Sequence, residues 1–107
     1  MELTSRFAHD ALYLLDEPES GLSPVAQMAL VAQLHAIGEQ SAQVIAVTHS
    51  PIVLGVPGAE IVEVGEHGVD RGLAVEETLA FRAMRDFLAD PHGIAEYMAD
   101  WAEGELG

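Results

Sequence analysis

The chain has 107 residues, which suits one small domain or part of a larger one. Half of its residues are hydrophobic, so it can bury a core, and general disorder is not expected. It carries 18 Asp and Glu residues against 4 Lys and Arg, a formal net charge of −14, and it contains no lysine. Because neutralising phosphates requires cationic side chains, this balance argues against direct nucleic-acid binding by this segment and against an anionic membrane surface as partner.

The cysteine content and the hydropathy of the chain exclude further classes of protein. There is no cysteine, so disulfides and thiolate metal sites are excluded. No apolar run approaches the roughly 18–20 residues of a membrane span. Residues 1–10 have no basic region followed by an apolar stretch and do not resemble a signal peptide, so we expect a cytoplasmic protein with no membrane contact.

The first half of the chain has the pattern of a strand, a helix and a second strand. Ala11–Leu15 is a short apolar run, typical of a strand buried on both faces in a parallel sheet. Ser23 and Pro24 form a helix start, with a side-chain oxygen at the cap and a proline where no N–H is needed, and we expect the helix to stop at Gly38. Gln43–Thr48 predicts a second buried strand. This spacing indicates a βαβ unit with parallel strands and a right-handed crossover.

The second half of the chain predicts a hairpin followed by two helices. Glu60–Val64 alternates like a strand, and Gly65–Gly68 predicts a tight turn into a second strand, Val69–Val75. One helix is expected over Val75–Ala89, and Pro91 starts a last helix that runs through about Glu103. The apolar residues expected to face inward or to dock on the body are Leu79, Met84, Phe87 and Leu88 in the first helix, and Ile94, Tyr97, Met98 and Trp101 in the second.

Chemically useful side chains follow both strands of the βαβ unit. Asp16 and Glu17 come directly after the first strand, and His49 follows the second. A carboxylate at such a position can hold the Mg²⁺ that bridges nucleotide phosphates, and a neighbouring carboxylate can orient and deprotonate the attacking water. The carboxyl ends of adjacent parallel strands share one edge of a sheet, so we expect these groups to lie together and to act as the back half of an ATP-hydrolysing site.

Two segments carry a resemblance to a known family. The first, LYLLDEPESGLSP from Leu12, resembles a Walker B motif running into a D-loop, and the second, VIAVTHSPIVLGVPGAEIVEV from Val44, resembles a switch-histidine segment. A weaker likeness covers ETLAFRAMRDFLADP from Glu77, which is similar to a helical tail. Together they resemble the C-terminal half of ABC-type ATPase domains, particularly the soluble SMC- and OLD-like "AAA family" predicted ATPases.

This resemblance implies a role for each motif residue. Asp16 would be the Mg²⁺-associated carboxylate, Glu17 the catalytic base and His49 the γ-phosphate switch. The loop Ser20, Gly21, Leu22, Ser23 would meet a second nucleotide-binding domain and its ATP. Transporter-type D-loops usually end in aspartate where Ser23 stands, which favours the soluble branch over a transporter.

The front half of such a site is missing from these residues. There is no G-x-x-x-x-G-K-[ST] loop and no LSGG-like signature, and Met1–His9 looks like the tail of the helix that precedes the Walker B strand. The chain is therefore expected to be a gene fragment, a product of a downstream start or half of a split ATPase. In the family fold the Walker A strand pairs with the switch-histidine strand, so Val44–Thr48 would present an unpaired edge and the chain would be poorly soluble or need a companion.

The resulting expectation is an α/β chain with part of a three-layer P-loop NTPase fold, ABC ATPase-like. Residues 1–75 would be the C-terminal half of the ATPase core, with a parallel βαβ unit and a small hairpin, and residues 76–107 a helical tail. ATP and Mg²⁺ would bind only when a Walker A-containing segment completes the site. The alternative is a non-catalytic protein-interaction module or remnant that retains the ATPase fold.

Overall fold

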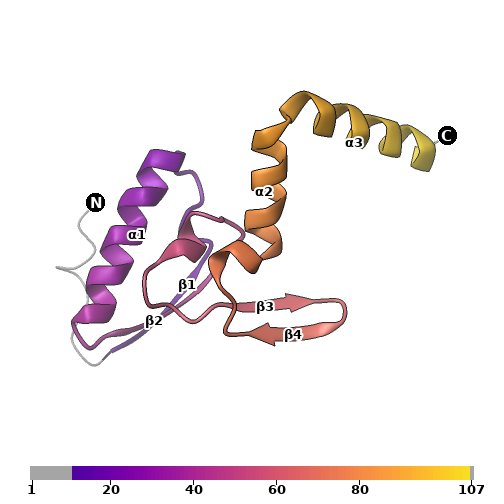
Figure 1. Ribbon diagram of the computed structural model, residues 1–107. Helices are drawn as coiled ribbons and strands as arrows, with labels where there is room; N and C mark the ends of the chain where they lie inside the picture. Colours follow the sequence, from indigo (N-terminus) through magenta and orange to yellow (C-terminus); the bar gives the residue numbers. More distant parts are fainter. Residues whose placement is uncertain (1–10, 107) are drawn as a thin grey trace.

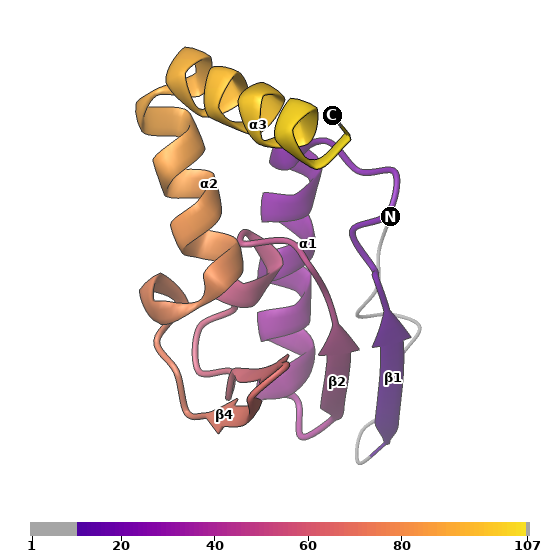
Figure 2. The same cartoon turned by 90° about the vertical axis from the view of Figure 1, so that its right-hand side faces the viewer.

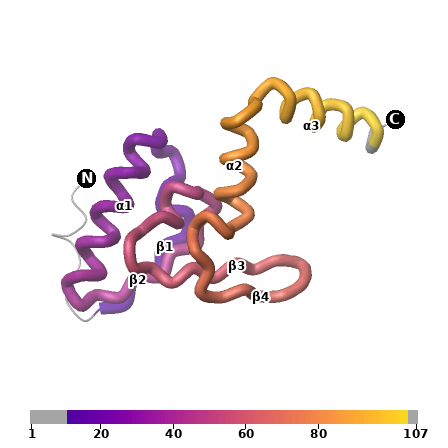
Figure 3. Tube along the Cα trace, in the orientation of Figure 1, coloured from indigo at the N-terminus to yellow at the C-terminus, as the bar shows by residue number. Residues whose placement is uncertain are grey.

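The computed structural model describes residues 11–106. A βαβ unit forms the body, a small hairpin lies beside it, and two helices lead away from it as an arm (Figure 1). The tube in Figure 3 shows the same separation between body and arm, and the principal extents of 55 × 30 × 23 Å describe an elongated molecule. The helix expected over Met1–His9 lies outside the described residues.

Two parallel strands and one connecting helix make up the body. Strand β1 (Leu12–Asp16) pairs with β2 (Gln43–Val47) from Leu12↔Gln43 to Asp16↔Val47, and helix α1 (Pro24–Glu39) connects them. Figure 2 shows the two arrows side by side and pointing the same way, with α1 running along them. The predicted parallel βαβ unit is confirmed, and each strand end lies within one residue of its predicted position.

Helix α1 begins as its sequence predicts and ends slightly later. The side chain of Ser23 accepts a hydrogen bond from the Ala26 N–H at 3.1 Å, and Pro24 occupies the first helical position. Gly38 does not end the helix, which continues to Glu39. Beyond the helix, Ser41 takes the left-handed conformation (φ 67°) that often follows a helix end.

The core lies between α1 and one face of the β1–β2 sheet. Leu30 and Leu34 of α1 are buried with Val53 of the short 3₁₀ turn Val53–Gly55, and Leu15 and Val44 pack against them from the strands. A helix that presents one apolar stripe to a sheet is the usual way for a small α/β unit to bury its core.

The other face of this sheet is not covered by any described residue. Side chains alternate along both strands, and those pointing away from α1 are 49–72% exposed: Leu12, Leu14, Ile45 and Val47. The prediction of strands buried on both faces is therefore wrong for residues 11–106, since only α1 covers the pair. The mixed α/β architecture, with its parallel strand pair, is compatible with a partial P-loop NTPase-like fold, and the described part has two layers.

The hairpin and the first helix of the arm follow the predicted order with different boundaries. Strands β3 (Val62–Gly65) and β4 (Gly68–Arg71) are antiparallel. Strand β4 stops early because Gly72 turns the chain (φ 68°). The expected helix over 75–89 is split at Thr78, whose extended backbone (ψ 150°) separates a 3₁₀ turn, Val75–Glu77, from helix α2 (Leu79–Ala89).

The arm does not pack as its sequence predicts. Helix α3 (Pro91–Leu106) starts at the predicted proline and runs past Glu103. The expected inward packing is wrong, because every large apolar residue predicted to pack, apart from Ile94, is 42–66% exposed: Leu79, Met84, Phe87, Leu88, Tyr97, Met98 and Trp101. Both helices extend away from the core (Figure 1), and no described element buries these side chains.

No helix within residues 11–106 combines the length and the apolar character that crossing a membrane requires.

The cap of α1 makes a testable contribution to stability. Replacing Ser23 by Ala removes the acceptor of the Ala26 N–H and should lower the free energy of unfolding by about 1 kcal/mol. Urea titration followed by circular dichroism measures this change. The matched variant Ser23→Asp keeps a capping oxygen and should unfold close to wild type, and an equal loss in both variants would contradict the capping role.

Candidate functional site

The functional residues predicted from the sequence lie where the two parallel strands end. The strand ladder continues one step beyond Asp16, because the Glu17 N–H donates to the carbonyl oxygen of Val47 at 2.7 Å. This bond fixes the position of Glu17 beside the residues that follow β2. The acidic pair and His49 therefore leave the sheet at the same edge, as expected from parallel strands.

The structure brings Glu17 and His49 together. The distance between His49 Nε2 and Glu17 Oε1 is 3.7 Å, and the side chains are 85% and 53% exposed, respectively. Glu17 itself has a left-handed backbone (φ 47°), which is uncommon for a residue other than glycine and redirects the chain from the strand into the loop. The carboxylate and the imidazole are thus adjacent, open to solvent and held by a specific backbone turn.

Asp16 faces a different direction from its neighbour. It is the last residue of β1 and lies in line with Leu14 on the exposed face of the sheet. Together with Leu14, Leu15, Ile45 and Val47 it borders a shallow open hollow on that face. Its carboxylate is therefore accessible from the uncovered side of the strand pair.

The loop that follows Glu17 is compact. The Ser20 N–H donates to the carbonyl of Glu17 at 3.0 Å, and the Leu22 N–H donates to that of Glu19 at 2.9 Å. Gly21 adopts φ 78°, which a side chain would strain, and the loop ends in the cap at Ser23. The predicted loop Ser20–Ser23 is thus an ordered turn that joins the site to the start of α1.

Glu19 belongs to this site although its sequence position did not single it out. Its Oε2 accepts a hydrogen bond from the backbone N–H of His49 at 3.4 Å, which links the loop after β1 to the loop after β2. Its other oxygen, Oε1, is buried and has no hydrogen-bond partner among the described residues. In the sequence, Glu19 is only a third acidic residue after Asp16 and Glu17. Such residues are common in solvated loops, so nothing in the sequence assigned it to the site.

Ser50 is the second residue whose role the sequence did not reveal. It is 7% exposed, and its Oγ accepts from the N–H groups of Ile52 and Val53, both at 3.2 Å. The hydroxyl donates to Gln27 Oε1, and the Gln27 amide donates to the Leu22 carbonyl at 3.1 Å. This network ties the segment after His49 to α1 and to the acidic loop. A serine before a proline at a strand end is the local signal for such a turn.

The residues at this edge fit one part of a Mg²⁺–nucleotide site. Mg²⁺ is usually held by one or two carboxylates together with water and substrate phosphates, and Asp16 and Glu17 are accessible carboxylates. No group of three or more acidic or histidine side chains among residues 11–106 is arranged to hold a metal ion without such help. The phosphate-binding lysine of a P-loop cannot come from these 107 residues, which contain none.

One family comparison gives a match. Residues 3–55, just under half of the chain, match the sequence model of a family described as "AAA domain, putative AbiEii toxin, Type IV TA system". The match includes β1, the acidic loop, α1, β2 and His49, and it supports an AAA-type, P-loop ATPase-like domain. No curated protein and no solved structure matches the chain.

The Ser50 network can be tested by its effect on stability. Ser50→Ala removes the acceptor of two backbone N–H groups and the donor to Gln27 Oε1 at a buried position, so unfolding should require about 1–3 kcal/mol less free energy. Denaturant unfolding measures the change. Ser20→Ala, at an exposed loop position, is the control and should stay within about 0.5 kcal/mol of wild type. Equal stability of the Ser50 and Ser20 variants would contradict the network.

Proposed function

We propose that this chain supplies the Walker B, D-loop and switch-histidine half of the ATP-hydrolysing site of a soluble ABC-type ATPase. The observation that carries the proposal is the 3.7 Å separation of Glu17 and His49 at the shared carboxyl edge of two parallel strands. The family match over residues 3–55 supports the coarser assignment to an AAA-type domain. The ABC-type assignment rests on the Walker B and switch-histidine segments of the sequence.

Each side chain has a distinct task under this proposal. Asp16 holds Mg²⁺, which when bound would neutralise charge on the nucleotide phosphates. Glu17 orients the attacking water and accepts its proton at Oε1 or Oε2, and its exposed carboxylate is accessible to such a water. His49 donates a hydrogen bond to the γ-phosphate and responds to its loss. The loop Ser20, Gly21, Leu22, Ser23 contacts a second ATPase domain.

The same chain requires completion by another segment. A nucleotide triphosphate at this edge would meet Asp16, Glu17 and Glu19 on a chain of net charge −14, with no lysine to offset its charge. We therefore infer negligible ATP binding and turnover by these residues alone. A Walker A-containing segment, on this or another chain, would supply the missing phosphate-binding loop. It would pair along the free edge of β2, which bonds only to β1 among the described strands. Residues 1–75 would form the ATPase part and residues 76–107 a helical tail.

A non-catalytic interaction module is the second candidate function. It is favoured by the exposed apolar side chains of α2 and α3, which are typical of surfaces that bind another protein. Under this alternative the Glu17–His49 pair has no catalytic role, and adding a P-loop segment would restore no hydrolysis.

Reassembly of the site provides the test. When the chain is combined with a lysine-bearing P-loop segment of the same family, ATP hydrolysis should appear. Glu17→Gln should then lower kcat by at least about 100-fold while nucleotide stays bound, because the base is lost and the binding groups remain. Phosphate release and retention of radiolabelled ATP measure the two effects.

The control for this experiment is Glu66→Gln, a matched substitution in the hairpin turn between β3 and β4. It should leave hydrolysis unchanged. Unaltered hydrolysis in the Glu17 variant would reject the base assignment, and failure of every P-loop segment to restore hydrolysis would favour the interaction module.

A further inference from the structure

Helix α2 has the amphipathic sequence of a helix that packs against a core, but its apolar side chains are not buried. It is 11 residues long and strongly amphipathic, yet none of its residues is buried. Isolated helices shorter than about 12–15 residues are marginal in water, and most helices in proteins are stabilised by burying an apolar face. The surface that covers α2 is therefore absent from residues 11–106.

The uncovered face of α2 forms one side of an apolar groove. The groove lies between α2 and the segment after His49, and its lining includes Pro51, Ile52, Phe81, Met84, Arg85 and Leu88. Met84 is 44% and Leu88 66% exposed. Phe81, Met84 and Leu88 stand at positions i, i+3 and i+7, so they form a stripe about 10 Å long on one side of the helix.

Helix α3 carries a stripe of matching length and spacing. Ile94, Tyr97, Met98 and Trp101 stand at positions i, i+3, i+4 and i+7. Tyr97, Met98 and Trp101 are each more than half exposed. The tube in Figure 3 shows α3 leading outward from the end of α2, and the exposure of these three side chains leaves the stripe accessible to another molecule.

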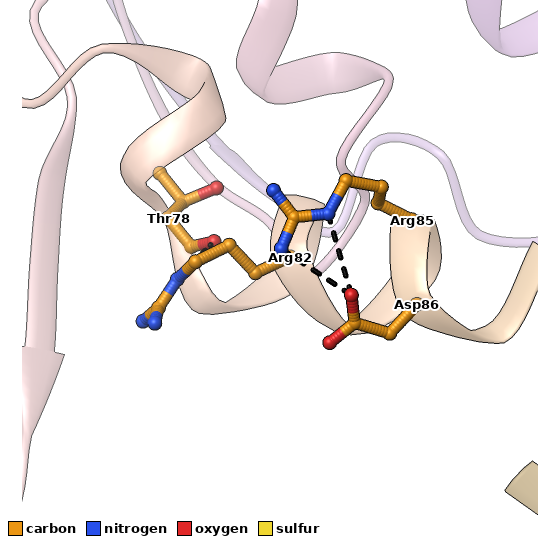
Figure 4. Close-up of polar contacts among 4 residues, drawn as sticks. All are labelled: Thr78, Arg82, Arg85 and Asp86. Atoms are coloured by element: carbon orange, nitrogen blue, oxygen red, sulfur yellow. Dashed lines mark hydrogen bonds and ion pairs between the residues drawn. The ribbon is translucent and has the colours of Figure 1, made fainter. Parts of the chain in front are cut away.

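The charges on the two helices are complementary. Helix α2 carries Arg82 and Arg85, whereas α3 contains no lysine or arginine and presents Glu96, Asp100 and Glu103. Both arginines contact residues of their own helix or its cap (Figure 4): Arg82 Nε donates to the Thr78 carbonyl at 3.4 Å, and Arg85 contacts the adjacent Asp86 at 3.3 Å. Exposed pairs of this kind are weak, so the arginines can bind other carboxylates at little cost.

We propose that the α2–α3 arm joins two copies of this chain, with α3 of each copy lying in the groove of the other. A two-fold arrangement uses the same groove and the same helix on both copies, so the contact is made twice. The apolar stripes match in length, and Arg85, which lines the groove, faces the acidic side of α3. A second copy is favoured over a different partner because this chain already carries both complementary surfaces. The proposal does not depend on ATP hydrolysis.

The first test uses the natural fluorescence of the arm. Trp101 is the only tryptophan of the chain and is 57% exposed. Sedimentation equilibrium of the full chain should give a dimer that dissociates on dilution, and the emission of Trp101 should shift to the red over the same range of concentration. Leu88→Glu, at the most exposed residue of the groove stripe, should weaken the dimer by roughly tenfold or more, because it would place an unpaired charge in the contact. Val25→Glu, at the 75% exposed second residue of α1, is the control and should dimerise like wild type.

Exchanging the charges of Arg85 and Asp100 distinguishes the loss of a direct contact from general disruption of the helices. In the proposed dimer Arg85 of one copy pairs with Asp100 of the other. Arg85→Glu and Asp100→Arg should therefore each weaken the dimer, and the double variant should recover most of the lost affinity because the pair is restored with opposite sign. Circular dichroism of each variant should show the helix content of wild type.

Three results would overturn the proposal. The first is a wild-type chain that remains monomeric up to about 1 mM. The second is a double variant that binds no better than the single variants. The third is a Leu88→Glu variant that still self-associates but no longer forms a complex with a P-loop segment. In the last case the arm would bind the completing segment of the ATPase.

Discussion

The parallel pairing of β1 with β2 is the interaction on which the candidate site depends. Its register sets Asp16 opposite Val47, and the bond from the Glu17 N–H to the Val47 carbonyl extends the ladder into the two loops. Because parallel strands end at the same edge, residues about thirty positions apart in sequence become neighbours. Without this pairing the acidic loop and His49 would be two unrelated loops.

A polar network holds those loops in their relative positions. Glu19 links the acidic loop to the backbone of His49, while Ser50 and Gln27 connect the second loop to α1 and to Leu22. Exposed side chains such as Glu17 and His49 depend on this kind of support for their positions, because little packing fixes them. The network holds the two loops without covering the Glu17 and His49 side chains, which stay more than half exposed.

Among residues 11–106, the strand pair is covered on one face only, and the apolar sides of α2 and α3 are exposed. Helix α1 covers one face of the strand pair, but Leu14 and Val47 on the opposite face remain open, as do Met84, Leu88 and Trp101 along the arm. The apolar patterns of these segments predicted burial, which is wrong among residues 11–106, because such a pattern does not say which molecule provides the cover. Large exposed apolar surfaces of this kind are typical of contacts with other chains.

The sequence by itself determined the βαβ unit, the hairpin, the cap at Ser23 and the types of chemical group that follow each strand, because periodicity, turn residues and capping are local properties. It also determined that no lysine is available. Only the tertiary structure decided that Glu17 and His49 meet, that Glu19 and Ser50 connect their loops, and that α2 and α3 stand away from the core. These features depend on contacts between residues distant in sequence, and an apolar stripe has the same pattern whether it faces its own domain or another molecule.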